Sequence, residues 1–199
     1  TSWQSVLPHR GAGSMAITLD PSKTNGDVGD SGPTSEPRLW GLRLVRVTFS
    51  GAVEPADGQL DVGDVTVTGW DGMNPPDPYV PTSVALSGDG RTLDIHFDPG
   101  GGTWSPLFDG LRYTIDIGGK FIDKWTRMAL AGDTDCQVRA LVGDASNDGR
   151  VNVADLVALR AVVSMPVTAA TARFDLNLDG KINLIDIGLA KSWYNDTAP

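Results

Sequence analysis

A twelve-residue pattern occurs twice near the C-terminus of the chain. Residues 144–155 read DASNDGRVNVAD, and residues 175–186 read DLNLDGKINLID. A shift of 31 residues superposes the two segments, with aspartate at the first, fifth and twelfth positions and glycine at the sixth. Every acidic residue between positions 143 and 199 except Asp196 occupies one of these positions. The repeat therefore predicts two equivalent loops whose carboxylates face a common centre.

The residue types at these positions are those of a calcium loop. Calcium takes about six to eight oxygen ligands at roughly 2.3–2.6 Å, and the glycine at position six permits the sharp turn that aims them inward. The seventh residue contributes its backbone carbonyl, so its side chain can carry a positive charge. The predicted ligands of the first loop are Asp144, Ser146, Asp148, the Arg150 carbonyl and Asp155. Those of the second loop are Asp175, Asn177, Asp179, the Lys181 carbonyl and Asp186. We expect two calcium ions, one in each loop.

A helical pattern follows each loop. Asn152 and Asn183 are favourable N-cap residues, and the twelfth-position aspartate then falls in the first helical turn. The pattern predicts helices over residues 153–163 and 184–193, the first of which ends before Pro166.

The loops differ from a standard EF-hand in two respects. The segments before them, residues 141–143 and 172–174, do not have the pattern of an entering helix, and both loops end in Asp where an EF-hand ends in Glu. Paired loop–helix units with these features resemble a type I dockerin, over residues 143 to about 194. One departure is Ser146, where that family has Asn or Asp, so we expect the first site to be the weaker one. The alternative is two Asp/Gly-rich turns that bind no metal.

The resemblance to dockerins implies docking to a cohesin-like β-sandwich through one helix face. In that family the two residues before the twelfth loop position contribute to recognition, together with basic residues further along each helix. The corresponding residues here are Val153, Ala154, Arg160, Leu184, Ile185 and Lys191. Small hydroxyl residues are common at the paired positions, and the apolar residues here favour a more hydrophobic contact. The alternative is that these side chains cover the module's own core or pack on the N-terminal domain.

Residues 1–142 have the pattern of a β-sandwich. Turn signals rich in Gly, Pro and Asp separate short β-like runs, and several runs alternate in polarity, such as Leu93, Ile95 and Phe97 on one face. We expect strands near residues 15–19, 39–49, 65–68, 84–86, 93–97, 113–117 and 136–142. The tract 20–37 is rich in Gly, Ser, Pro and Asp and is expected to be a long surface loop. About seven short strands predict a sandwich of two sheets.

Three segments of this region, VTFSGAV (47–53), DVTVTG (64–69) and LRYTIDI (111–117), resemble bacterial Ig-like domains of cell-surface and secreted proteins. Their junction to a dockerin-like C-terminus through VRALVGD (138–144) resembles secreted planctomycete-type proteins. The expected fold is mostly β with a small α module. An Ig-like β-sandwich is expected over residues 1–142, and the dockerin-like pair of EF-hand-like calcium loop–helix repeats over residues 143–199.

Composition limits the partners. The formal net charge of −9 disfavours nucleic acid and anionic membranes, both of which need a basic surface. No apolar stretch reaches the roughly 18 residues that a membrane span requires. Free calcium in the cytosol is too low for weak calcium sites, which favours an extracellular or cell-surface location. Cys136 is the single cysteine and is expected to be a buried small apolar residue, with an intermolecular disulfide as the alternative.

No catalytic motif is visible. The chain lacks Gly-x-Ser-x-Gly, His-Glu-x-x-His and a phosphate-binding glycine loop. We therefore expect a non-catalytic extracellular assembly protein whose C-terminal module mediates protein–protein interaction. The alternative is a carbohydrate-binding accessory component of a polysaccharide-degrading system. Its sugar platforms would be aromatic side chains, of which the candidates are Trp40, Trp70, Tyr79, Trp104 and Trp125.

Overall fold

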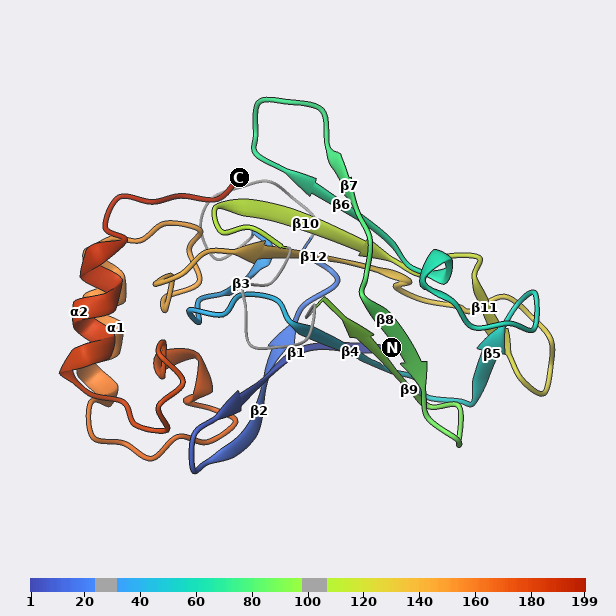
Figure 1. Cartoon of the computed structure of the whole chain (residues 1–199), viewed down its shortest axis with the longest axis horizontal. Helices are drawn as coiled ribbons and strands as arrows, with labels where there is room; N and C mark the ends of the chain where they lie inside the picture. Colours follow the sequence, from blue (N-terminus) through green and yellow to red (C-terminus); the bar gives the residue numbers. More distant parts are fainter. Residues whose placement is uncertain (24–31, 98–106) are drawn as a thin grey trace.

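The computed structural model describes residues 1–23, 32–97 and 107–199. Two five-stranded sheets form a sandwich, and a small helical module lies at one end of it (Figure 1). The first sheet has the order β2-β1-β4-β9-β8 and contains β1 (Ser2–His9), β2 (Gly13–Leu19), β4 (Leu44–Thr48), β8 (Ser83–Leu86) and β9 (Thr92–His96). The second has the order β3-β12-β10-β6-β7 and contains β3 (Thr34–Glu36), β6 (Thr66–Trp70), β7 (Asp77–Tyr79), β10 (Leu111–Asp116) and β12 (Asp135–Ala140). A small third sheet pairs β5 (Val53–Pro55) with β11 (Phe121–Asp123).

The strands alternate between side chains that are buried in the core of the sandwich and side chains that face outward. In β9, Leu93 and Ile95 are fully buried between the sheets, while Asp94 faces outward. The outward face is stabilised by a cross-strand pair, because Arg46 of β4 donates two 2.7 Å hydrogen bonds to Asp94 directly opposite. Cys136 of β12 is fully buried in the same core, so the expectation of a buried thiol is confirmed.

Each of the seven predicted strands overlaps an observed strand, but two strands that lie next to the module were not predicted. Neither β1 nor β3 was expected, and β3 lies within the tract 20–37 that was expected to be a surface loop. That prediction is wrong for Thr34–Glu36, which is a buried strand that pairs in parallel with β12. Residues 24–31 of the tract lie outside the described residues.

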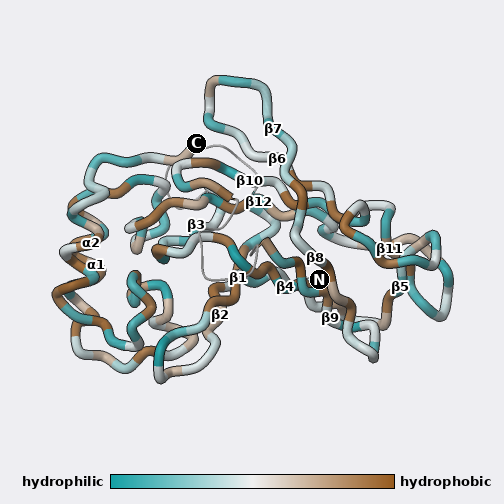
Figure 2. The backbone as a smooth tube through the Cα atoms, in the orientation of Figure 1, coloured by the Kyte–Doolittle hydropathy of each residue, from teal (hydrophilic) through white to brown (hydrophobic). Residues whose placement is uncertain are grey.

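The C-terminal module consists of two short α-helices, a 3-10 turn η2 (Ala172–Phe174), and loops that lie between the helices and the sandwich. Helix α1 (Val153–Val162) and helix α2 (Leu184–Ser192) begin and end within one residue of the predicted bounds. A small core of Ala145, Leu159, Leu176 and Ala190 joins them. Both helices carry hydrophobic segments and lie at the end of the molecule opposite β5 and β11 (Figure 2). The structure therefore confirms a β-sandwich with a small α module; the Ig-like character of the sandwich stays a prediction.

Candidate metal centre and docking face

Each loop leads directly into a helix whose N-terminus is capped by side chains. Asn152 accepts the N–H of Ala154 at 2.7 Å, and Asp155 Oδ2 accepts the N–H of Asn152 at 2.7 Å. Asn183 and Asp186 make the same pair of bonds in the second half, at 2.7 and 2.8 Å. The asparagine is therefore the N-cap, and the twelfth loop residue lies in the first helical turn, as the sequence predicts, where it completes a capping box.

The second oxygen of each twelfth-position carboxylate turns back into its loop. Asp155 Oδ1 accepts the N–H of Ser146, and Asp186 Oδ1 accepts the N–H of Leu176, both at 2.8 Å. Asp155 and Asp186 are fully buried, and burial raises the pKa of the Asp186 carboxyl above its usual range. Buried carboxylates of this kind need hydrogen bonds and a positive charge to remain ionised.

The first-position carboxylates are held by the turn around the glycine. Asp144 accepts the N–H of Asp148 on Oδ1 at 3.0 Å and the N–H of Gly149 on Oδ2 at 2.8 Å. In the second loop, the N–H groups at the fifth and sixth positions reach Asp175 at 3.1 and 2.9 Å in the same way. The two loops therefore share one backbone frame, which the sequence repeat alone predicts.

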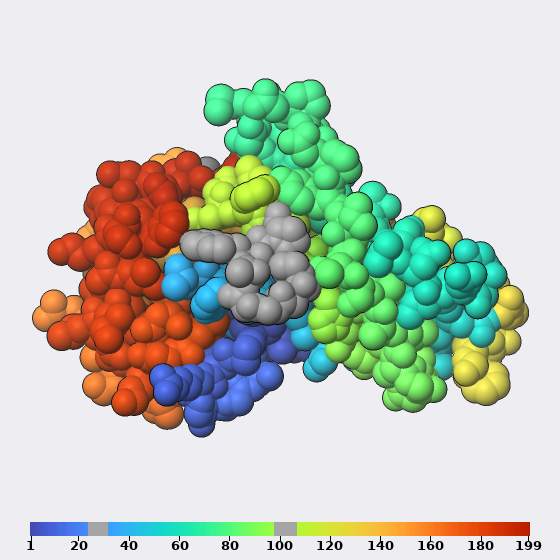
Figure 3. All heavy atoms as spheres, in the orientation of Figure 1, coloured from blue at the N-terminus to red at the C-terminus, as the bar shows by residue number. Residues whose placement is uncertain are grey.

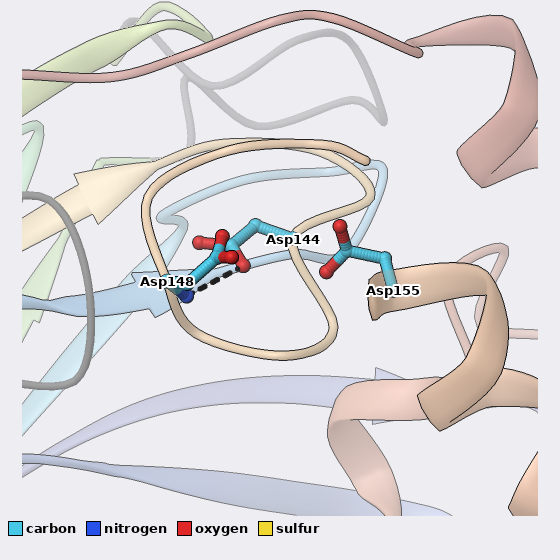
Figure 4. A group of neighbouring side chains, drawn as sticks. All are labelled: Asp144, Asp148 and Asp155. Carbon is cyan, nitrogen blue, oxygen red and sulfur yellow. Dashed lines mark hydrogen bonds between the residues drawn. The ribbon is translucent and has the colours of Figure 1, made fainter. Parts of the chain in front are cut away.

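Three carboxylates of the first loop converge on one point. One oxygen from each of Asp144, Asp148 and Asp155 lies within 4.8 Å of the others, and the side chains point toward one another from the loop and from the start of α1 (Figure 4). Burial raises the pKa of the Asp144 carboxyl, and the nearby charge of Asp155 acts in the same direction. A divalent cation among these oxygens would offset that repulsion.

The remaining predicted ligands lie within the same frames. Ser146 Oγ is 3.5 Å from the first-position carboxylate, and the Asn177 amide donates to the fifth-position carboxylate at 3.2 Å. The N–H groups of Arg150 and Lys181 each donate to the fifth-position carboxylate of their own loop at 2.9 Å. Carboxylate, hydroxyl, amide and carbonyl oxygens make a hard donor set, which fits calcium better than a softer metal. Within the described part of the chain, the group of three converging carboxylates is found in the first loop.

The six residues predicted to meet a partner are all solvent-exposed. They lie on α1 and α2 as Val153, Ala154, Arg160, Leu184, Ile185 and Lys191. Leu184 is 75% exposed, Val153 62% and Ile185 60%. The module forms one end of the molecule, and α2 lies open on the face shown in Figure 3. These side chains are therefore not part of the module's own core.

Two side chains of the sandwich that sequence reasoning missed lie against the loops. His9 ends β1 and contacts Asp175, and Ser35 of β3 contacts Asp144. No local pattern marks either residue. A histidine at a strand end and a serine in a polar tract are common features, and their partners lie far away in the sequence.

The glycine at the sixth position of the second loop has two roles. Gly180 has a φ of +83°, which L-residues rarely adopt, and a Cβ there would also collide with the backbone carbonyl oxygen of Arg10 in the β1–β2 turn. At Gly149, with a φ of +79°, a Cβ would lie 2.8 Å from the guanidinium carbon of Arg139. The sandwich therefore approaches the second loop backbone to backbone.

Four of the aromatic side chains considered for sugar binding, Trp40, Trp70, Tyr79 and Trp125, lie in the described part of the chain. Arg112 lies 4.5 Å from the ring of Trp70, and Arg43 lies 5.5 Å from that of Trp40. Tyr79 packs edge-on against Tyr113 with centroids 5.2 Å apart. Trp125 is 79% exposed. Trp104 lies outside the described residues.

A repeated acidic loop that leads into a capped helix defines a class of duplicated cation-binding loop–helix modules. Within this class, residues 142–192 match the family model of the dockerin type I domain. The predicted resemblance of the C-terminal segment to type I dockerins, which are interaction modules, is thereby confirmed. In the described residues, no helix has both the length and the apolar character needed to cross a bilayer.

Solved structures with similarity to the chain are distant. The crystal structure of the S-layer protein rSbsC(31-844) has 19% identity and a TM-score of 0.36, covering 54% of this chain and 13% of that chain. The N-terminal part of the bacterial S-layer protein SbsC has 18% identity and a TM-score of 0.36, covering 54% and 22%. A type II cohesin–X–dockerin complex from Acetivibrio cellulolyticus has 17% identity and a TM-score of 0.27, covering 83% and 94%. The chain therefore spans less than a quarter of either S-layer chain. A comparison with curated proteins gave no significant match.

Proposed function

We propose that this chain is a non-catalytic component of an extracellular or cell-surface assembly. Its C-terminal module, residues 143–199, binds two calcium ions and docks to a cohesin-like β-sandwich through α1 and α2. Residues 1–142 form the domain that the module attaches to its partner. The dockerin type I match over residues 142–192 supports the interaction role and the calcium requirement.

The observation that carries the proposal is the difference in solvent exposure between the last residue of the second loop and the two residues before it. Asp186 is fully buried, while Leu184 and Ile185 immediately before it are 75% and 60% exposed. Adjacent apolar side chains that face water usually mark an interaction site. Arg160 and Lys191 in the last turns of the two helices give the same face a basic edge.

The arrangement also explains why calcium would be needed for docking. The exposed residues of each helix are the tenth and eleventh positions of the loop, and the twelfth-position carboxylate lies in the first helical turn. Fixing that carboxylate on a cation fixes the first helical turn and the side chains at positions ten and eleven. Calcium therefore acts by ordering the docking face, and does not need to touch the partner.

A capture experiment tests the proposal. The full chain is immobilised and exposed to a purified type I cohesin and to the extracellular fraction of the native source, with calcium or with EGTA. We expect capture that requires calcium. Val80→Asp serves as the control, because Val80 is 69% exposed on the sandwich, and this variant should capture as the wild type does. Equal capture in calcium and EGTA, or capture lost in the control, would contradict docking through the module.

A further inference from the structure

The first-position carboxylate of each loop is hydrogen-bonded from outside the loop. Nδ1 of His9 lies 2.6 Å from Oδ2 of Asp175, and the hydroxyl of Ser35 donates to Oδ2 of Asp144 at 2.5 Å. All four residues are at most 2% exposed. The two contacts come from different sheets, because His9 ends β1 and Ser35 lies in β3.

Both carboxylates divide their oxygens in the same way. Oδ2 accepts the sandwich side chain and the N–H of the loop glycine, at 2.8 Å in Asp144 and 2.9 Å in Asp175. Oδ1 faces the inside of the loop, where it accepts the N–H of the fifth residue. The sandwich therefore orients each carboxylate through one oxygen and leaves the other directed toward the loop centre.

His9 is itself held in one orientation by a buried ion pair. Nη1 of Arg38 lies 3.1 Å from Nε2 of His9, and since a guanidinium has no acceptor, Nε2 accepts and Nδ1 donates to Asp175. Arg38 makes two 2.6 Å bonds to the carboxylate of Glu36, and the hydroxyl of Ser5 donates to the same carboxylate. This buried chain of contacts joins the second loop to strands β1 and β3.

Backbone N–H groups of the sandwich and of the segment after β3 donate hydrogen bonds to the same two loops. The N–H of Arg10 donates to the carbonyl of Leu178 at 2.9 Å, and the N–H of Leu39 donates to that of Leu176 at 2.8 Å. At the first loop, the N–H of Ser35 donates to the side-chain oxygen of Asn147 at 2.7 Å. At each loop, these hydrogen bonds hold the backbone next to the side-chain contact with the first-position carboxylate.

We propose that the β-sandwich is part of both calcium sites. His9 positions Asp175, and Ser35 positions Asp144. Calcium binding by each loop is therefore coupled to the packing of the module against the sandwich of the same chain. This inference rests on the proposed calcium binding and goes beyond it, because it assigns a role in each site to residues more than one hundred positions from the loop.

The coupling has a defined size and direction. Removing a side chain that orients a metal ligand typically costs about 10- to 100-fold in metal affinity. Thermodynamic linkage requires the converse as well, so calcium must stabilise the packing of the module against the sandwich by the same factor. Each positioning residue serves one loop, and its loss should therefore affect one site and spare the other.

Calorimetric titration of calcium into the full chain tests this selectivity. Asp148→Ala isolates the second site and Asp179→Ala isolates the first. Adding His9→Leu to the Asp148→Ala chain should weaken binding about 10-fold or more, whereas adding Ser35→Ala should change it less than twofold. In the Asp179→Ala chain, Ser35→Ala should weaken binding and His9→Leu should not.

Matched variants separate positioning from general damage. His9→Asn keeps a donor near the position of Nδ1 and should retain most of the affinity that His9→Leu loses. His96→Ala and Ser83→Ala remove the same residue types from β9 and β8 and should leave both sites unchanged. If His9→Leu fails to fold, the smaller Ser35→Ala change decides the question on its own.

If the wild type binds calcium and all variants bind it with equal affinity, the inference is overturned but the proposed function is not. A wild-type chain that binds no calcium would overturn the proposed function as well.

Hydrogen exchange tests the converse effect in the unmodified chain. The amides of Arg10 and Leu39 donate to the second loop, so EGTA should speed their exchange about 10-fold or more. The amides of β4 and β9 lie inside the first sheet and should exchange equally with and without calcium. Unchanged protection at Arg10 and Leu39 would show that calcium binding is independent of the packing of the module against the sandwich, which would overturn the inference.

Discussion

His9 and Asp175 are 166 positions apart in the chain, yet their side chains meet at 2.6 Å and are both fully buried. One end of this contact is a strand of the sandwich and the other is the first ligand position of a predicted calcium loop. The module is therefore packed directly against the sandwich and is not connected to it by a flexible linker alone. Its helices face solvent, while its loops contact the end of the sandwich, an arrangement that fixes the proposed docking face relative to the sandwich.

Calcium removal should lower the stability of the full chain. Each loop gathers carboxylates that are fully buried at its first and twelfth positions, and these repel one another without a cation. At a calcium concentration about 100 times the dissociation constant, each site adds roughly 2.7 kcal/mol to the free energy of unfolding. Scanning calorimetry with calcium and with EGTA measures the difference, and an unchanged midpoint would contradict the prediction.

Charges on the second helix should abolish partner capture. Leu184→Asp combined with Ile185→Asp removes apolar area that would supply a few kcal/mol at about 25 cal/mol per Å2. The equivalent double change at Val153 and Ala154 should weaken capture less, because those side chains are smaller. Surface plasmon resonance against the captured partner measures both. Calcium titration serves as the control and should be unaffected; loss of fold in the Leu184/Ile185 variant would place the docking face elsewhere.

The second loop should bind calcium more tightly than the first. Position three is Asn177 in the second loop and Ser146 in the first, and a hydroxyl is a weaker ligand than an amide oxygen. Asp148→Ala should therefore leave the tighter of the two dissociation constants, and Ser146→Asn should tighten the first site in the Asp179→Ala background. Calorimetry that finds the weaker constant in the Asp148→Ala chain would reverse the ranking.

Two glycine-to-alanine changes in the second half should have opposite effects. Gly180→Ala places a Cβ at φ +83° and against the Arg10 carbonyl, so it should destabilise the chain by more than the roughly 1–2 kcal/mol that a left-handed residue costs. Gly188→Ala lies in α2 with nothing within 4 Å of the added Cβ, and it should stabilise by about 0.5–1 kcal/mol. Denaturant unfolding in calcium compares them. A loss of no more than about 1–2 kcal/mol in Gly180→Ala would mean that the second loop does not contact the sandwich as described.

Cys136 should be inert in the native state. The residue is fully buried in the sandwich core, and burial raises the pKa of its thiol to about 12. The thiolate is the nucleophile, so alkylation by iodoacetamide at pH 8 should be slow in the folded chain and fast in denaturant. Mass spectrometry follows the reaction. Rapid labelling of the folded chain would show that the core opens around β12.

The local chemistry of the repeat determined the candidate metal centre. Ligand spacing, the glycine turn and the capped helix starts all depend on residues within twelve positions of each other, so the loops and the bounds of α1 and α2 follow from sequence. Periodic alternation likewise predicted the central strands, because a buried face imposes a period of two wherever it occurs.

Only the tertiary structure shows what supports the loops from outside. Strand β3 has no hydrophobic alternation, and it exists because it pairs with β12 and is covered by the module. Ser35 meets Asp144 across 109 positions and His9 meets Asp175 across 166. Such contacts depend on how two sheets and a helical pair close on one another. A polar side chain in a polar tract carries no sign of that partner until the chain has folded.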